Sequence, residues 1–225
     1  ALVRRGYREP LATLASNVMG TAHVLEAARA CPSVRAIVVV TTDKCYENTG
    51  DPWGYRENDR LGGHDPYSAS KACAEIVSAA WRASYWQDDD APLLATVRAG
   101  NVIGGGDWSE DRLVPDLIRA AEAGQAARIR NPDAVRPWQH VLEPLAGYLI
   151  LGSRLLGGDR DCATVWNFGP ALTDMQPVSA LCDVLCTALG GGWGGDPGPH
   201  PKEEAVLRLD SSKAMLRLGW RPRWA

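Results

Sequence analysis

The chain has 225 residues, of which 45% are apolar and 23% are charged, a composition typical of a soluble globular protein rather than a disordered one. The net charge of -3 gives no general attraction to nucleic acid or to an anionic membrane. No apolar run approaches the roughly 18 residues of a membrane-spanning helix. We therefore expect neither a nucleic-acid partner nor a membrane partner.

The first half of the chain alternates between helical and strand-like patterns. Residues 11–30 have a helical apolar period, and Pro10 directly before them suits a helix start. The segment "AIVVVTTD" (36–43) is short, apolar and β-branched, which is typical of a parallel strand buried on both faces. Residues 66–86 are expected to form another helix, and "PLLATVRAGNVIG" (92–104) a second buried strand that ends in a glycine-rich loop.

The second half has a looser pattern. The segments 110–124 and 176–190 are amphipathic and predict helices, and "TVWNFGP" (164–170) predicts a short strand. The glycine-rich run "GGGWGGDPGPHP" (190–201) predicts a flexible linker or loop.

Together these patterns predict an α/β fold with a doubly wound parallel sheet and a smaller C-terminal lobe. We expect residues 1–104 to belong to the sheet domain and 105–225 to form mainly the lobe, with 163–170 returning to the sheet. Ligands of such sheets bind beyond the carboxyl ends of the strands. "TTDK" (41–44) and "GNVIGGGD" (100–107) both lie at such ends.

The segment "HDPYSASKACAE" holds a tyrosine and a lysine four residues apart at a helix start, so that they share one face. A nearby ammonium favours the phenolate form and lowers the pKa of a tyrosine from its usual value of about 10. Tyr67 and Lys71 could therefore take a proton from a sugar hydroxyl while a hydride leaves the same carbon. An aromatic anchor and a surface lysine are the alternative, because the YxxxK spacing alone is common.

The six cysteines include no CxxC pair, and the four histidines do not cluster with them, so we expect no metal site. Scattered thiols in a chain of this size are typical of a reduced, cytoplasmic protein.

Several separated motifs agree in order and spacing with one family. "SNVMGT", "TTDK", a YxxxK pair that follows Lys44 by 23 residues, and "RAGNVIGGGD" resemble the extended short-chain dehydrogenase/reductase family, the NAD-dependent epimerases and dehydratases of nucleotide sugars. The "TDK" triplet, "CYEN", "WGYREN" and "RPWQHV" are most similar to the members that dehydrate CDP-glucose. The resemblance runs along the whole chain.

The resemblance implies a Rossmann-like sheet, NAD as cofactor, and conversion of CDP-glucose to CDP-4-keto-6-deoxyglucose in deoxysugar biosynthesis. It also implies a homodimer or a higher homo-oligomer. Families of this kind open with a glycine fingerprint after their first strand, and no segment here has that GxGxxG spacing. Residues 1–10 read as a charged loop, and we expect the chain to be a fragment that lacks the N-terminal cofactor segment.

The same resemblance implies roles for individual residues. Asp43 would be the acid for the departing C6 hydroxyl, and Thr42 would hold the C4 hydroxyl near Tyr67. Lys44 stands where many relatives carry a glutamate base, and could act as a base or as an electrostatic stabiliser of the C5 carbanion. The remaining implied contacts are with the cofactor, from Tyr67, Lys71 and Thr41, and with the substrate, from Thr42, Asn101, Arg112 and Arg136.

Three further residues are ascribed other roles. Asn17 would be a surface position or a hydrogen-bonding partner of the active-site backbone, Arg130 an ordinary surface arginine, and Asn167 a structural residue. Asp43 and Lys44 could also be a solvated turn at the end of a strand.

Two other functions stay open. A nucleotide-sugar epimerase would need Tyr67 and Lys71 but no acid at Asp43, and a non-catalytic remnant would bind sugar nucleotides or nothing.

Overall fold

The computed structural model describes residues 2–200 and 206–224. Its helices, including short 3₁₀ and π segments marked η, are α1 (Val3–Arg8), α2 (Pro10–Leu14), η1 (Ala15–Met19), α3 (Gly20–Arg29), η2 (Asp43–Cys45), α4 (Pro66–Tyr85), α5 (Leu113–Glu122), α6 (Leu142–Leu156), η3 (Arg160–Cys162), η4 (Leu172–Asp174), α7 (Val178–Leu189) and α8 (Ser212–Leu218). Its strands are β1 (Ala36–Val40), β2 (Leu93–Ala99), β3 (Val102–Ile103), β4 (Ala126–Ile129), β5 (Val135–Arg136), β6 (Gln139–His140), β7 (Val165–Phe168), β8 (Gln176–Pro177) and β9 (Gly192–Gly195).

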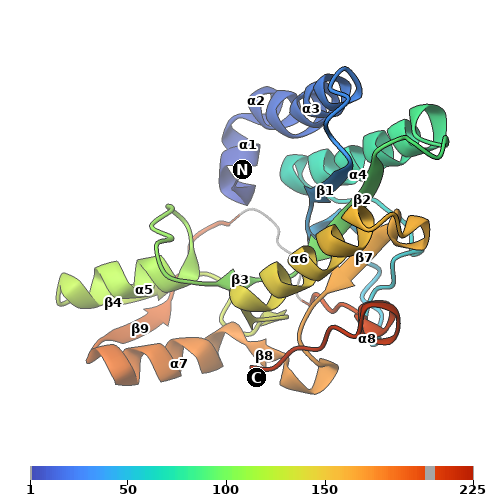
Figure 1. Cartoon of the computed structure of the whole chain (residues 1–225). Helices are drawn as coiled ribbons and strands as arrows, with labels where there is room; N and C mark the ends of the chain where they lie inside the picture. Colours follow the sequence, from blue (N-terminus) through green and yellow to red (C-terminus); the bar gives the residue numbers. More distant parts are fainter. Residues whose placement is uncertain (1, 201–205, 225) are drawn as a thin grey trace.

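A parallel sheet of order β1-β2-β7 forms the centre of the molecule (Figure 1). Ala36 of β1 lies opposite Leu93 of β2, and Thr96 of β2 lies opposite Val165 of β7. The expected α/β class with a parallel sheet is confirmed, as are the predicted helices that became α4, α5 and α7. Strand β7 shows that the segment around residue 165 does pair within the central sheet.

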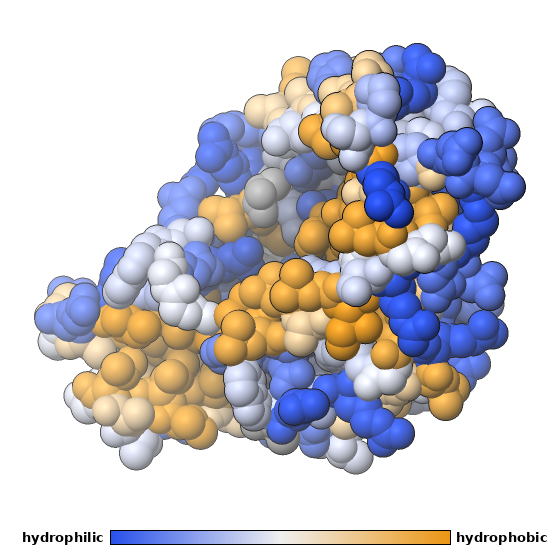
Figure 2. Space-filling model, viewed as in Figure 1, coloured by the Kyte–Doolittle hydropathy of each residue, from blue (hydrophilic) through white to orange (hydrophobic). Residues whose placement is uncertain are grey.

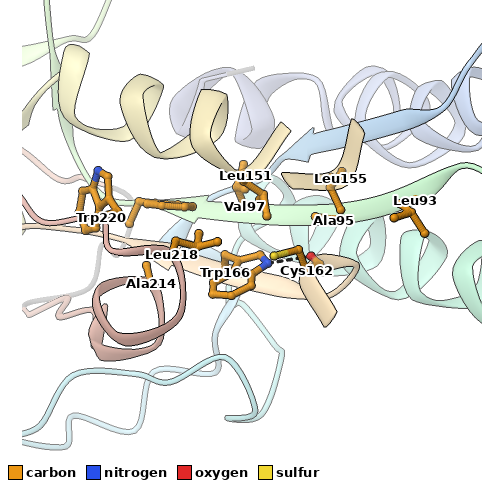
Figure 3. Packing of buried hydrophobic residues seen from close by; sticks show 11 residues of the cluster. Leu93, Ala95, Val97, Leu151, Leu155, Cys162, Trp166, Ala214, Leu218 and Trp220 are labelled. Atoms are coloured by element: carbon orange, nitrogen blue, oxygen red, sulfur yellow. Dashed lines mark hydrogen bonds between the residues drawn. The ribbon is translucent and has the colours of Figure 1, made fainter. Parts of the chain in front are cut away.

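One face of the sheet is covered by α6 and α8 through an apolar cluster (Figure 3). Alternate residues of β2 point to this face, where Leu151 and Leu155 of α6 and Trp166 of β7 meet them. The period of two along a strand explains this sorting. Trp166 also donates from Nε1 to the carbonyl of Cys162 at 3.0 Å, so that its one polar atom is satisfied inside the cluster.

The opposite face of the sheet is covered by the helical run from α2 to α3 and by α4. Leu25 of α3 and Leu94 of β2 are fully buried here, with Ile37 and Val39 of β1 packed beside them. The predicted helix 11–30 is confirmed as a nearly continuous run from Pro10 to Arg29, which contains the π-helical segment η1.

A second group of elements lies apart from the sheet (Figure 1). Helices α5 and α7 pack on the parallel pair β4–β9 around Leu117, Ile129 and Cys182. The linker predicted for 190–201 is wrong at residues 192–195, which form β9. Glycines can complete a strand when the ladder and one anchoring side chain hold it, and Trp193 supplies that anchor by packing in the cluster and donating to Asp183 at 2.8 Å.

Two other segments differ from the expectations. The charged loop expected at residues 1–10 contains the helix α1, which reaches the loop before α5 through Arg4–Asp111 and Arg8–Glu110 ion pairs. The strand expected at 36–43 ends at Val40.

Strand β1 is only half-buried, although its apolar run predicts burial on both faces. In the described residues β1 pairs with β2 alone, and Val40 is 49% exposed. Figure 2 shows an apolar band along α6, where Leu149 is 76% exposed.

The elements after residue 105 do not all belong to the second group, since α6, β7 and α8 pack with the central sheet. A separate substrate lobe therefore stays a proposal, and in it we include α5, β4, α7 and β9. No helix within the described ranges is long and apolar enough to cross a membrane.

Candidate active site

The backbone turns sharply directly after β1. Thr42 is extended, and its hydroxyl accepts from the backbone N–H of Lys44 at 3.4 Å, which caps the short helix η2. Because η2 starts at Asp43, Asp43 and Lys44 do not follow the alternation of a strand. The backbone therefore turns at Asp43 instead of continuing as a strand.

Asp43 is a buried carboxyl group, only 2% exposed. Its Oδ1 accepts from the Thr42 hydroxyl at 3.0 Å, whereas its Oδ2 has no hydrogen-bond partner among the described residues. Burial raises the pKa of Asp43, and the charges of Lys44 and Arg136 together with the Thr42 hydrogen bond oppose that rise. A buried carboxyl with a raised pKa is a candidate proton donor, because it holds its proton more tightly than an exposed one.

The start of α4 is fixed by a strong N-terminal cap. Asp65 Oδ1 accepts from the backbone N–H groups of Tyr67 and Ser68 at 2.9 and 3.0 Å, and Pro66 occupies the first helical turn. Helix α1 approaches closely at Gly6, where an added Cβ would lie 3.2 Å from the Tyr67 nitrogen. Tyr67 is thus held from two sides at a defined position.

Tyr67 lies beside the turn that carries Asp43. Burial raises the pKa of Tyr67, a hydrogen bond with the Thr42 side chain lowers it, and the charges of Asp43 and Arg112 act in opposite directions. The Thr42 side chain therefore acts on both groups, through its hydrogen bond to Asp43 and its effect on the pKa of Tyr67. Lys71, one helical turn farther along α4, donates from Nζ to the Val40 carbonyl at the end of β1 at 3.1 Å.

Asn17 reaches this site indirectly. Its Nδ2 donates to Ser70 Oγ at 2.8 Å, and Ser70 in turn donates to the Tyr67 carbonyl at 2.7 Å. Asn17 lies in the π-helical segment η1, an irregularity that is frequent at functional sites. Its contact is therefore with the side chain of Ser70, which carries the link to the active-site backbone.

Lys44 faces a small cavity of its own, about 50 Å³, between α1 and the start of α4. Tyr7, Asn48, Asp65 and Ser68 are among its lining residues, and Asp43 and Tyr67 are not. The turn after β1 thus presents Asp43 toward Tyr67 and Lys44 toward this cavity.

The arginines singled out in the sequence lie at different depths. Arg136 of β5 is buried, and its charge acts on Asp43. Arg112 is half-exposed, lies 3.9 Å from Asp107, and its charge acts on Tyr67. Arg130 is only partly exposed, at 23% for its side chain, and lies 4.0 Å from Asp111.

Asn101 follows β2, and its backbone carbonyl accepts from the Gln139 N–H at 3.0 Å. This contact ties the loop after β2 to the start of β6. Among the residues of the described ranges, no group of three or more His, Cys, Asp or Glu side chains could hold a metal ion.

Residues 1–158 match the model of the "NAD dependent epimerase/dehydratase family", which is more than half of the chain. The chain belongs to this family. Among its curated relatives, a CDP-glucose 4,6-dehydratase from Salmonella typhimurium is 48% identical over 229 residues, which cover 99% of this chain and 64% of that protein. A dTDP-glucose 4,6-dehydratase from Streptomyces griseus is 28% identical, covering 92% of this chain and 60% of the relative.

Solved structures share the fold at lower sequence identity. A dTDP-glucose 4,6-dehydratase from Streptomyces venezuelae, with NAD and TYD bound, superimposes with a TM-score of 0.84 at 24% identity, covering all of this chain and 66% of that one. A UDP-glucose 4-epimerase from Thermotoga maritima gives 0.82 at 20% identity, covering all of this chain and 70% of that one. The chain thus spans about two thirds of the length of these relatives and solved structures.

Behind the site lies a buried polar cluster that the sequence did not reveal. Thr41, expected to contact the cofactor, is buried and donates its hydroxyl to Glu75 Oε1 at 2.5 Å. Arg98 and Thr96 of β2 complete the surroundings of Glu75. The one available signal was the position of Glu75, four residues after Lys71 on the same helix face.

Tyr46 and Asn167 extend this cluster to strand β7. Tyr46 donates to Asn167 Oδ1 at 2.8 Å, and Asn167 Nδ2 donates to the carbonyls of Tyr55 and Asp210. Asn167 is fully buried, in keeping with the structural role expected for it.

Proposed function

We propose that the chain carries the catalytic centre of a CDP-glucose 4,6-dehydratase, which converts CDP-glucose to CDP-4-keto-6-deoxyglucose and one water molecule. The observation that carries the proposal is Asp43, a buried carboxyl with a raised pKa and one unpartnered oxygen beside Tyr67. The 48% identity to the Salmonella typhimurium relative supports the choice of CDP-glucose.

The cofactor that we propose is NAD. Tyr67 and Lys71 lie at the carboxyl ends of parallel strands, where doubly wound sheets bind dinucleotides. The residues present fit the nicotinamide-ribose end of NAD, whereas the sequence contains no GxGxxG segment for its diphosphate. When bound, NAD supplies a two-electron acceptor that takes the hydride from C4 and later returns it to C6.

The first step that we assign to this chain is removal of the proton from the C4 hydroxyl by the Tyr67 phenolate. Thr42, whose side chain acts on the pKa of Tyr67, would hold the C4 hydroxyl in line with the phenol oxygen. Burial raises the pKa of Tyr67, contrary to the lowered value expected from the sequence, so the proposed step depends on the positive charge of Lys71, one helical turn away, to favour the phenolate. Tyr67, Lys71 and Thr41 are the cofactor contacts that we propose, with the hydroxyl of Thr41 directed to Glu75.

Water then leaves across C5 and C6. The C4 ketone acidifies the C5 hydrogen, and the departing C6 hydroxyl needs a proton, because hydroxide is a poor leaving group. We assign that proton to Asp43. Lys44 would act at C5, as a neutral base or as a cation that stabilises the enolate, and the cavity beside it offers a place for that side of the sugar.

The remaining polar residues would hold the substrate. Arginine suits a diphosphate because its fork donates two parallel hydrogen bonds. We propose contacts from Asn101, Arg112 and Arg136, of which the half-exposed Arg112 is the most accessible. Arg136 is buried near Asp43, so it would contact the substrate from the inner side of the site.

We also propose that the protein is a cytoplasmic homodimer or higher homo-oligomer. Apolar side chains are exposed on the helices that lie on one side of the sheet, with Leu11 81%, Val24 65% and Ile76 57% exposed. A second copy could cover them. The six free cysteines fit a reducing compartment.

Incubation of the complete gene product with NAD and CDP-glucose tests the proposal, with dTDP-glucose and UDP-glucose as parallel substrates. We expect a 4-keto-6-deoxy sugar to form fastest from the cytidine nucleotide. A C4-epimerised sugar without loss of water would instead identify an epimerase, and turnover of none of the three would favour a non-catalytic protein.

A further inference from the structure

Glu75 lies one helical turn beyond Lys71 on α4, at the spacing at which a lysine and a glutamate commonly form an ion pair. In the described residues these two side chains do not pair. Lys71 donates to the Val40 carbonyl at 3.1 Å, and Glu75 is 4% exposed beneath it. Other contacts must therefore hold the Glu75 carboxylate away from the Lys71 ammonium, which the proposed reaction uses.

The Glu75 carboxylate is fully occupied by other donors. Arg98 donates from Nε to Oε1 at 3.0 Å and from Nη2 to Oε2 at 3.1 Å. Thr41 donates to Oε1 at 2.5 Å, and Thr96 donates to Oε2 at 2.6 Å. Two oxygens with about four acceptor positions thus meet four donors.

Arg98 is itself held rigidly. It is 3% exposed, its guanidinium lies 4.6 Å from the centre of the Tyr46 ring, and Nη1 donates to the Glu57 carbonyl at 3.2 Å. The planar fork of an arginine can bind both oxygens of a carboxylate, which a lysine cannot do. The geometry of Arg98 therefore fixes Glu75 in one orientation.

We infer that Arg98 is a positioning residue for the reaction: by holding both oxygens of Glu75, it prevents this carboxylate from capturing Lys71 and leaves the ammonium at the end of β1, one turn from Tyr67. The inference rests on the proposed function, because it gives Lys71 its role beside Tyr67. It adds a task for two buried charges to which the proposed reaction assigns no contact with substrate or cofactor.

The charged and titratable groups around Lys71 and Tyr67 come from several elements. They are Asp43 and Cys45 of η2, Arg112 before α5, and Asp65 and Glu75 of α4 with its cap. Partial burial lowers the pKa of Lys71, and the charges of Glu75 and Cys45 raise it. Of these groups, only Glu75 lies one turn from Lys71 on its own helix, so a freed Glu75 is the carboxylate that can reach it.

The test is the pH dependence of kcat/KM for the Arg98→Met variant of the complete gene product. A freed Glu75 should pair with Lys71, so that Tyr67 loses a favourable charge and its pKa rises. The acid limb of the profile should shift by about one unit to higher pH. At any pH below that limb, kcat/KM should then be lower by about tenfold. The matched control is Glu75→Gln with Arg98→Met, in which no carboxylate remains to capture Lys71 and the limb should return toward its original position.

A purely structural role predicts something else: both variants would lose stability, and neither would move the limb. An unmoved limb in Arg98→Met, or a moved limb that the double variant fails to restore, would overturn the inference. If Arg98→Met does not fold, Arg98→Lys keeps the charge but binds one oxygen of Glu75, and a smaller shift in the same direction is expected. The absence of any shift in that variant would count equally against the inference.

An ultraviolet difference titration of tyrosinate needs no turnover. Subtracting the titration of a Tyr67→Phe background isolates the ionisation of Tyr67 in each variant. We expect a higher pKa of Tyr67 in Arg98→Met and a restored one in the double variant, whether or not CDP-glucose is the substrate. Failure of this inference is thereby distinguishable from failure of the proposed function.

Discussion

The two faces of strand β2 differ in chemistry although they belong to the same seven residues. Leu93, Ala95 and Val97 face α6 and contact apolar side chains. On the other face, Leu94 joins the apolar cluster around Leu25, whereas Thr96 and Arg98 point toward Glu75 of α4. All seven residues are buried, so burial alone does not decide which face is apolar.

The difference assigns separate tasks to the two faces. The α6 face supplies hydrophobic stabilisation along the whole strand, whereas on the other face only Leu94 of β2 contributes to an apolar cluster. The polar face stabilises less, because burying charges is costly even when they are well paired. It fixes instead the directions of Thr41 and Lys71, which flank the turn with Asp43. Substitutions on the two faces should therefore separate stability from catalysis.

The largest effect should come from Tyr67→Phe on the catalytic side. In the proposed reaction, loss of the phenolate leaves no base for the C4 hydroxyl, and general-base loss typically costs about 100- to 10,000-fold in rate. Steady-state kinetics of the complete gene product would measure the loss. The matched control is Tyr148→Phe on α6, where the ring meets Phe168 on the apolar face and a rate near that of the parent is expected. Comparable losses of rate in both variants would contradict the assignment of catalysis to one face of the sheet.

A large effect on stability, with little on catalysis, is expected from Leu218→Ala. Leu218 is 6% exposed in the apolar cluster, and removing a buried leucine side chain typically costs about 2–5 kcal/mol of unfolding free energy. Leu216→Ala, on the same helix at 83% exposure, should stay within about 0.5 kcal/mol. Urea unfolding would measure both, and equal costs would contradict the packing described for α8.

A smaller effect should follow from exchanging polarity between the faces. Thr96→Val removes a donor from the buried Glu75 carboxylate, and Val97→Thr places a hydroxyl in the apolar cluster. Each leaves a buried polar group without its partner, which costs about 1–3 kcal/mol. Thermal unfolding would measure both losses. A neutral Thr96→Val would show that Glu75 does not depend on this contact.

The smallest effect is a gain of stability in Asp43→Asn. The folded-state pKa of Asp43 lies above its unfolded value because the group is buried, so the folded state holds the proton more tightly. Stability from this group is then greatest at low pH and falls as the pH rises from the unfolded pKa, about 3.9, through the folded one.

Asp43→Asn has no carboxyl group to ionise, so the variant does not lose this stability as the pH rises. Its melting temperature should exceed that of the parent near neutral pH, and the difference should shrink toward zero below about pH 4. A difference that grows on acidification would mean that the folded-state pKa of Asp43 is lowered rather than raised.

The strongly periodic segments could be predicted from the sequence, because a regular apolar stripe specifies both the element and its buried face. Helix α4 is the best case, since Asp65 and Pro66 at its start are also residues typical of a helix N-terminus. Helix α1 was missed because three arginines in six residues look like a solvated loop. The glycine-rich strand β9 was missed because local propensity opposes a strand that its pairing with β4 imposes.

Part of the candidate site could likewise be predicted from the sequence, and part could not. Tyr67 and Lys71 share a face by helical spacing alone, and their positions could be anticipated. The buried pair Glu75–Arg98 could not, because charged residues are mostly exposed and only the packing of α4 on β2 brings these two together. The separation of Asp43 from Lys44 also depends on η2, whose single turn leaves no periodic signal.

Single-turnover kinetics of Asp43→Asn in the complete gene product, mixed with NAD and CDP-glucose in deuterated water, test the central claim most directly. With Tyr67 and Lys71 intact, the absorbance of reduced nicotinamide should appear and persist, and the C5 hydrogen should exchange with solvent while the C6 hydroxyl remains. That result would assign the proton for the departing hydroxyl to Asp43. Release of the 4-keto-6-deoxy product at the parent rate would contradict the assignment and leave the turn after β1 without a catalytic acid.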